Sequence, residues 1–196
     1  MDIAIVKYNA GNICSVDYAL KRLGVTARIT DDEVSLRRAD KVIFPGVGEA
    51  NTTMAYLREH RLDVLIRSLQ QPVLGICIGM QLLCRHSEEG DTACMGVFDA
   101  EVKRFVSYRH EDKIPHMGWN TLCDVSGALF PPSLENAFVY FVHSYYVPVN
   151  ASTVATTGYT QPFSAALCKD NFHATQFHPE KSGSVGETVL RNFLNL

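Results

Sequence analysis

The chain has 196 residues, of which 46 % are hydrophobic and 20 % charged, and its formal net charge is −3. This composition predicts a globular chain with one full core over residues 1–196 and excludes an intrinsically disordered protein. Basic residues do not cluster, which argues against nucleic acid as the main partner, and no apolar run is long enough to cross a membrane.

The six cysteines show neither a Cys-x-x-Cys pair nor a regular spacing. A disulfide framework and a metal site are therefore not expected. The N-terminus starts directly with an apolar, strand-like run and has no signal-peptide pattern, so we expect a cytoplasmic protein.

Strand-like and helix-like segments alternate in the first half of the chain. We expect a turn over residues 9–12, a first helix capped by Ser15, and an end to that helix at Gly24. The alternation predicts a parallel sheet covered by helices. The predicted strands are residues 2–8, 25–29, 41–44 and 72–76, and the predicted helices are residues 15–23, 52–60, 62–69 and 80–85.

The second half of the chain contains strand-like runs separated by turn-rich pieces, and one final helix over residues 185–194. This pattern predicts a mixed or antiparallel extension of the sheet, and hence an α/β fold. The predicted strands are residues 101–105, 138–142, 154–159, 163–167 and 172–177.

A cysteine between two glycines, Gly-Ile-Cys-Ile-Gly at residues 75–79, lies between a predicted strand and a predicted helix. A nucleophile at such a turn takes up a strained backbone conformation, and small neighbours two residues away prevent collisions. The N-terminus of the following helix favours a thiolate at Cys77. A buried core cysteine with glycines for close packing fits the pentapeptide equally well.

A cysteine nucleophile needs a base, and the base needs an orienting group. In Gln-Phe-His-Pro-Glu, residues 176–180, an extended chain would point His178 and Glu180 to the same side. The alternative for this motif alone is a surface histidine and glutamate at a strand end. Pro-Gly-Val-Gly, residues 45–48, follows another strand and could present backbone N–H groups to an oxyanion, or be an ordinary turn.

Together and in this order, the three motifs resemble the class I (triad) glutamine amidotransferases over nearly the whole chain. The resemblance implies a flavodoxin-like three-layer sandwich with a central, mostly parallel sheet and an antiparallel extension. Within that family, further stretches resemble the glutaminase subunits of imidazole glycerol phosphate synthase. They are Pro-His-Met-Gly-Trp-Asn at residues 115–120, Tyr-Phe-Val-His-Ser-Tyr at residues 140–145, and Gln-Phe-His-Pro-Glu-Lys-Ser at residues 176–182.

The resemblance implies roles for individual residues. Cys77 matches the nucleophile, His178 the base and Glu180 the orienting acid. The oxyanion hole matches Val47, Gly48 and Ile78, and the glutamine-binding residues match Gln81, Glu89, His143, Ser144 and Tyr145. One departure is visible, because the family often has an aromatic residue soon after the Pro-Gly-Val-Gly loop, whereas residues 49–51 here are Glu-Ala-Asn.

The resemblance also implies a partner, a (β/α)₈-barrel cyclase subunit that uses the ammonia to make imidazole glycerol phosphate and an aminoimidazole carboxamide ribotide. No metal or cofactor is expected. We expect Trp119 to contact this partner, and Asn12, Tyr140 and Lys181 to be further contacts on the same face as the nucleophile. Trp119 is the only tryptophan of the chain. From composition alone, an interface anchor and a core residue are equally good interpretations of it.

Three alternatives stay open at this point. The chain could be the glutaminase of another synthase, such as anthranilate or aminodeoxychorismate synthase. It could be a cysteine peptidase of related fold, although the longer peptidase signatures are missing. It could also be a non-catalytic regulatory module, which would be expected to lose Cys77 or His178.

Overall fold

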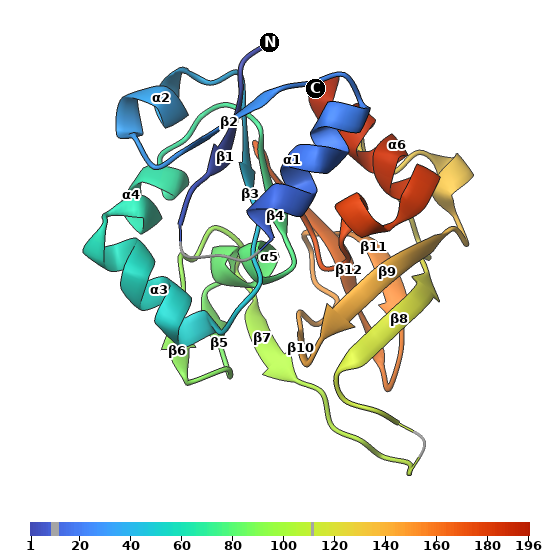
Figure 1. Ribbon diagram of the computed structural model, residues 1–196. Helices are drawn as coiled ribbons and strands as arrows, with labels where there is room; N and C mark the ends of the chain where they lie inside the picture. The colour runs from blue at the N-terminus through green and yellow to red at the C-terminus, as the bar shows by residue number, and fades with distance from the viewer. Residues whose placement is uncertain (9–11, 111) are drawn as a thin grey trace.

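The computed structural model describes residues 1–8, 12–110 and 112–196, and a seven-stranded sheet forms its centre (Figure 1). The strand order is β11-β12-β13-β4-β3-β1-β2. Its parallel part consists of β2 (Ala27–Thr30), β1 (Ile3–Val6), β3 (Lys41–Phe44), β4 (Val73–Ile76) and β13 (Phe172–Thr175). The antiparallel extension consists of β12 (Pro162–Lys169) and β11 (Thr153–Gly158).

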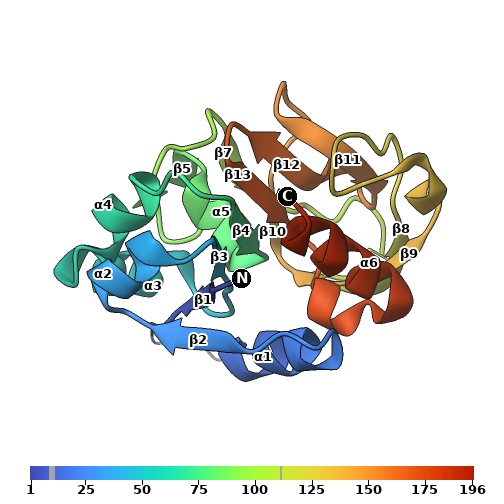
Figure 2. The same ribbon diagram turned by 90° about the horizontal axis from the view of Figure 1, so that it is seen from above.

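Helices cover both faces of this sheet (Figure 2). One face carries α1 (Ile13–Arg22) and α6 (Gly183–Leu194), and the other carries α2 (Glu33–Arg38), α3 (Ala50–Glu59), α4 (Leu62–Arg67) and α5 (Ile78–Leu83). Alternate residues of β1 enter the two cores: Ala4 packs with the α3 side, and Ile5 with the α1 side. The expected three-layer α/β fold is confirmed.

Two of the predicted strands do not join the central sheet. β7 (Glu101–Arg104) belongs to a small sheet with β10 (Tyr145–Tyr146), β5 (His86–Ser87) and β6 (Thr92–Ala93). β9 (Phe138–His143) pairs with β8 (His116–Thr121) to form a separate antiparallel ribbon, which we call the β8–β9 ribbon. The pairing partners of β7 and β9 are short or polar segments without strand signals of their own, so the prediction placed both strands in the nearest large sheet.

The first helix begins earlier than predicted. Asn12, and not Ser15, is its N-terminal boundary residue, and Gly24 follows the helix with a φ of +80°. The expected turn at residues 9–12 lies outside the described residues except for Asn12. The short helix α2 was not predicted; Asp32 caps it by accepting from Ser35 N at 2.8 Å. None of the helices in the described residues is long and apolar enough to cross a membrane.

Candidate active site

Cys77 occupies the junction between β4 and α5, and its backbone is strained. Its φ is +55° and its ψ is −109°, a combination that L-residues rarely adopt. The backbone N–H of Cys77 donates to the carbonyl of Thr175 at 2.7 Å, which ties the turn to β13. The expected strand-to-helix turn at the cysteine is thus present.

The glycines on either side of Cys77 leave no room for larger residues. A Cβ atom on Gly79 would lie 2.2 Å from the carbonyl oxygen of Phe44, and one on Gly75 would lie 2.8 Å from Cδ1 of Leu83. Glycine at position 79 therefore lets the turn pack against β3, and glycine at position 75 lets α5 pack against β4. The same turn therefore produces both the close packing and the placement of the Cys77 sulfur beside the cavity.

His178 and Glu180 form a buried pair at the end of β13. His178 Nδ1 lies 2.7 Å from Glu180 Oε1, and Asn12 Nδ2 donates to the same carboxylate oxygen at 2.5 Å. The two side chains meet for a reason other than the predicted extended chain. Pro179 starts the 3₁₀ turn η2 (Pro179–Lys181), which folds Glu180 back onto the imidazole.

The surroundings of His178 favour its charged form. Burial by itself would lower the pKa of His178, but its interactions with the neighbouring Cys77 and Glu180 raise it. Its buried Nε2 has no hydrogen-bond partner within the described residues. The imidazole therefore has one nitrogen held by Glu180 and one free for proton transfer at the Cys77 side.

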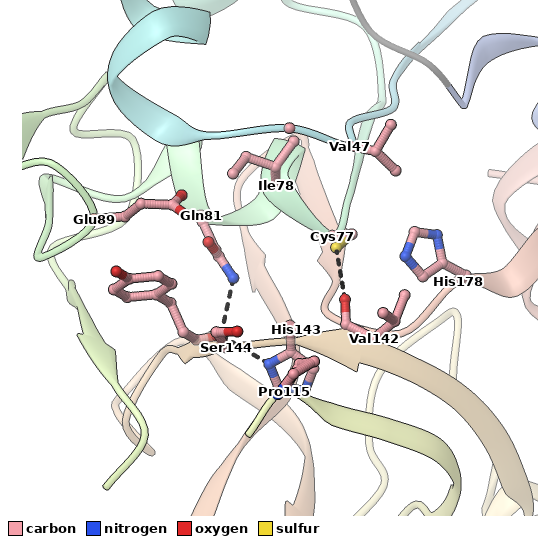
Figure 3. Close-up of a pocket in the computed structure, with 12 residues that line it drawn as sticks. Val47, Cys77, Ile78, Gln81, Glu89, Pro115, Val142, His143, Ser144 and His178 are labelled. Carbon is pink, nitrogen blue, oxygen red and sulfur yellow. Dashed lines mark hydrogen bonds between the residues drawn. The ribbon is translucent and has the colours of Figure 1, made fainter. Parts of the chain in front are cut away.

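A cavity of about 320 Å³ opens beside the sulfur. Figure 3 shows Cys77 and His178 at one end of this cavity and Gln81 and Glu89 at the other. The cavity brings together most of the residues that the sequence predicted. It is lined by Val47, Gly48, Cys77, Ile78, Gln81, Glu89, Pro115, Val142, His143, Ser144, Tyr145 and His178.

The end of the cavity away from the sulfur presents hydrogen-bond acceptors. Gln81 Nε2 donates to the carbonyl of Tyr145 at 3.0 Å, and Glu89 Oε2 accepts from Ala50 N at 2.8 Å. Burial raises the pKa of Glu89, although the Ala50 N–H opposes this effect. A cation bound in the cavity would hold Glu89 in its charged form.

The Pro-Gly-Val-Gly loop lies over the other side of the cavity and is held at both ends. The buried Tyr8 hydroxyl donates to the carbonyl of Pro45. At the far end, Glu49 replaces the usual aromatic of this region and caps α3, accepting from Asn51 N at 3.1 Å and Thr52 N at 2.9 Å. The departure from the family pattern therefore has a local structural role.

Two groups near the sulfur were not predicted. The carbonyl of Val142 lies 3.9 Å from Cys77 Sγ (Figure 3), and Nε2 of the buried Gln176 lies 3.7 Å from it. Gln176 precedes His178 by two positions, so the same strand alternation that singled out His178 could have identified it. The position of Val142 depends on the β8–β9 ribbon, for which only one strand was predicted.

The β8–β9 ribbon has an inner face that supports the cavity wall. His143 Nδ1 lies 2.7 Å from the carbonyl of Tyr145, and its Nε2 lies 3.0 Å from Nδ1 of His116. Nε2 of His116 lies 3.3 Å from Nδ2 of Asn120. Because the Tyr145 carbonyl can only accept, this series of contacts requires two neutral imidazoles. Burial lowers the pKa of His116 to about 4 and that of His143 to about 3, which agrees with neutral rings.

The outer face of the ribbon is apolar and exposed. Met117 is 62 % exposed, Trp119 is 56 % exposed and Phe138 is 59 % exposed. The Trp119 ring meets that of Tyr140 across the strands, with centroids 6.0 Å apart. Trp119 is thus not a core residue.

Asn12 and Lys181 were both expected at the partner surface, but they differ. Lys181 is exposed, whereas Asn12 is only 4 % exposed, with its amide bonded to Glu180. The structure therefore places Asn12 beside His178 and Glu180, because its amide is buried against the carboxylate.

Comparison with known proteins gives a consistent result over the full chain. The model of the family "Glutamine amidotransferase class-I" matches residues 5–196. The "Imidazole glycerol phosphate synthase subunit HisH" of Bacteroides thetaiotaomicron is 66 % identical, and that of Yersinia pestis is 45 % identical; the match covers 100 % of this chain and of each relative. The chain belongs to the class I glutamine amidotransferase family, in its HisH branch.

Solved structures of this class share the fold. A protein described as a glutamine amidotransferase aligns with a TM-score of 0.74 at 21 % identity, over 98 % of this chain and 97 % of the other. PurLQS from Thermotoga maritima aligns with a TM-score of 0.70 at 17 % identity, over 99 % and 97 %. The HisH branch is one of enzymes, and this chain is a glutamine amidotransferase.

Proposed function

We propose that the chain is the glutaminase subunit of imidazole glycerol phosphate synthase, an enzyme of histidine biosynthesis. It hydrolyses glutamine to glutamate and ammonia and passes the ammonia to a cyclase subunit. The observation that carries this proposal is the strained Cys77 beside the paired His178 and Glu180, in one cavity with Gln81 and Glu89. The full-length HisH relatives support the choice of synthase over anthranilate or aminodeoxychorismate synthase.

In the first half of the reaction, Cys77 attacks the side-chain amide carbon of glutamine. The new bond joins Sγ to that carbon, and the carbonyl electrons move onto oxygen. His178 then gives its Nε2 proton to the amide nitrogen, the carbon–nitrogen bond breaks, and ammonia leaves. A γ-glutamyl thioester remains on Cys77, and Glu180 keeps the imidazole in position throughout.

In the second half, water replaces ammonia. The now neutral His178 takes a proton from water as the oxygen attacks the thioester carbon. The carbon–sulfur bond breaks, glutamate leaves, and the thiolate–imidazolium pair is restored. We assign the stabilisation of both oxyanions to the backbone N–H groups of Val47 and Ile78, with Gly48 giving the loop its freedom.

The far end of the cavity suits the charged end of a free amino acid. Gln81 and Glu89 offer acceptors to the α-ammonium group, and the backbone of residues 143–145 forms the opposite wall. A peptide-linked glutamine has no α-ammonium group there, so these acceptors favour an amidotransferase over a peptidase.

The outer face of the β8–β9 ribbon is our candidate for the cyclase contact. It carries exposed Met117, Trp119 and Phe138, with Tyr140 and Lys181 nearby. Large apolar side chains, tryptophan above all, are favoured at the centres of protein interfaces. We propose a (β/α)₈-barrel partner that receives ammonia before water protonates it and makes imidazole glycerol phosphate and the aminoimidazole carboxamide ribotide. Residues 1–196 would form one amidotransferase domain of this complex, acting in the cytoplasm, where cysteines stay unpaired as they are here.

Labelling with an electrophilic glutamine analogue tests the proposal. We expect covalent modification at Cys77 and protection by glutamine, together with glutamate release in the presence of the cyclase subunit. The Cys77→Ala variant should neither be labelled at that position nor release glutamate. Absence of labelling, or labelling that glutamine does not prevent, would favour a peptidase or a regulatory module instead.

A further inference from the structure

Two amide side chains form a buried polar connection from the nucleophile to the far end of the cavity. Gln176 is fully buried, and its Nε2 lies 3.7 Å from Cys77 Sγ. Its Oε1 accepts a hydrogen bond of 2.9 Å from Nε2 of Gln81, which also donates to the carbonyl of Tyr145 at 3.0 Å. The sulfur is thereby linked through two amides to one backbone carbonyl.

The Tyr145 carbonyl fixes the direction of each bond in this connection. Because a carbonyl can only accept, the Gln81 amide must turn its NH₂ group toward Tyr145. That NH₂ group also faces Gln176, which must therefore present its oxygen to Gln81 and its own NH₂ group to the sulfur. His143 Nδ1 lies 2.7 Å from the same Tyr145 carbonyl, so both lone pairs of this anchor are used.

The fixed direction has a consequence at each end. At the sulfur, an N–H donor stabilises a thiolate, whereas the Val142 carbonyl at 3.9 Å can accept only from a protonated thiol. At the far end, both N–H groups of Gln81 are occupied, so its carbonyl oxygen is the group left to face the cavity. An oxygen at that place recognises a cation such as an α-ammonium group.

We propose that Gln176 is a positioning residue that acts on both the Cys77 sulfur and the Gln81 side chain. Its NH₂ group holds the Cys77 sulfur as a thiolate, and its oxygen holds Gln81 with the acceptor toward the substrate. Gln176 acts through Cys77 and Gln81 and does not touch glutamine itself. The inference rests on the proposed function for the identity of the substrate, whereas its contact with the sulfur can be tested without glutamine.

Two substitutions separate the two contacts of Gln176. Gln176→Glu keeps the shape and an acceptor for Gln81 but replaces the N–H on the sulfur by a carboxylate oxygen. Gln176→Met is similar in length and removes both contacts. Gln70→Met, the same change at an exposed glutamine, is the matched control.

Alkylation of Cys77 by iodoacetamide is followed on the full chain as a function of pH, by mass spectrometry of the Cys77 peptide. The kcat and KM for glutamine are measured on the complex with the cyclase subunit.

We expect Gln176→Glu to slow alkylation near neutral pH about tenfold and to move its pH profile upward, with KM changed by less than about threefold. Gln176→Met should slow alkylation by a smaller factor and raise KM about tenfold, because Gln81 is no longer oriented. Gln70→Met should match the native chain in every measurement.

Native alkylation profiles in both Gln176 variants would overturn the contact with the sulfur. An unchanged KM in Gln176→Met would overturn the orientation of Gln81. Loss of kcat with native profiles and native KM would reduce Gln176 to a packing residue, and so overturn the proposal. If the native complex released no glutamate, the proposed function would fail, and the alkylation profiles would still decide the contact with the sulfur.

Discussion

At the scale of single residues, Cys77 shows how packing and chemistry place the same demand on the sequence. The positive φ of Cys77 turns its sulfur into the cavity, and the turn that does so brings Gly79 against the Phe44 carbonyl. A side chain at position 79 would therefore disturb the core and the nucleophile at once. The Gly-Ile-Cys-Ile-Gly motif could be recognised in the sequence because the steric requirement for glycine acts between residues close together in the chain.

We expect Gly79→Ala to lower the free energy of unfolding by about 3 kcal/mol, because its Cβ would lie 2.2 Å from a backbone oxygen and β3 would have to shift. Urea denaturation measures the change. Gly158→Ala is the matched control, since a Cβ there has no atom within 4 Å, and it should change stability by less than about 1 kcal/mol. Equal stability of the two variants would contradict this reading of the turn.

In the proposed mechanism, the charge of Glu180 orients and stabilises the His178 imidazole, while Cys77 supplies the attacking atom. We therefore expect Glu180→Gln to lower kcat about a hundredfold and Cys77→Ala to reduce glutamate release to background. Steady-state assays of the complex measure both. Glu187→Gln on α6 is the control and should keep native activity, because Glu187 pairs with Arg22 at the surface, away from the cavity. A Glu180→Gln variant as inactive as Cys77→Ala would show that the carboxylate does more than orient.

At the scale of elements, strand alternation gives the β8–β9 ribbon two different faces, an apolar outer face and an inner face that carries the histidine pair. Trp119 faces outward opposite Tyr140, while His116 faces inward opposite His143. The sequence predicted β9 from its apolar run but missed β8, in which polar residues and Gly118 interrupt the pattern. Only the pairing of the strands reveals that residues 27 positions apart share a hydrogen bond.

The neutral His116 and His143 should make stability depend on pH. Burial keeps their native pKa values at about 4 and about 3, below the value of 6.5 for an exposed histidine. As the pH falls below 6.5, the unfolded chain therefore takes up protons before the native one does. The free energy of unfolding should fall between pH 6.5 and about 4, by up to about 1.4 kcal/mol per pH unit for each imidazole.

Urea denaturation at several pH values within this window measures the slope. In His116→Phe one titrating group is gone, and phenylalanine fits the surrounding aromatic rings, so the slope should become shallower. Asn120→Ala removes a neighbour of His116 but keeps both imidazoles, so the native slope should remain. A native slope in His116→Phe would exclude His116 as a source of the pH dependence.

The outer face of the same ribbon should determine affinity for the cyclase subunit. Trp119→Ala removes the largest exposed apolar side chain of this face and should weaken binding about 10- to 100-fold. Val34→Ala, at an exposed apolar position on α2, is the control and should bind normally. Calorimetric titration measures both. If Trp119→Ala bound the cyclase subunit with native affinity, the interface would have to lie elsewhere than on the outer face of the ribbon.

At the scale of the whole molecule, the sequence predicted what local sterics and strand alternation determine. The parallel strands and the turn at Cys77 belong to this group, whereas His178 and Glu180 meet through the 3₁₀ turn at Pro179 and not through the predicted extended chain. Strand alternation could have placed Gln176 on the side of His178, but the contacts of Gln176 and Val142 with the sulfur could not be predicted, because they join residues 99 and 65 positions apart. The small sheets were missed for a related reason, since two-residue strands carry no periodic signal.

The Pro-Gly-Val-Gly loop, to which we assign the oxyanion hole, connects the active site to the question of a partner. The Val47 N–H belongs to the peptide between Gly46 and Val47, and glycines flank Val47 on both sides, Gly48 with a φ of +135°, so this stretch of backbone can reorient at low cost. Tyr8 holds the Pro45 end of this loop and Glu49 caps α3 at its other end, so the Gly46–Val47 peptide lies between two fixed points. A partner that fixes one orientation of the loop would improve alignment of the Val47 N–H without altering Cys77.

We therefore expect slow glutamate release by the isolated chain and an increase of about 5- to 150-fold on adding the cyclase subunit with its nucleotide ligand. The increase should appear in kcat, because the donor acts on the oxyanion and not on bound glutamine. Trp119→Ala should need more cyclase subunit to reach the same maximum, because it weakens binding and leaves the loop intact. Equal turnover with and without the partner would show that the loop is already aligned in the free chain, and the ribbon would then deliver ammonia without controlling its release.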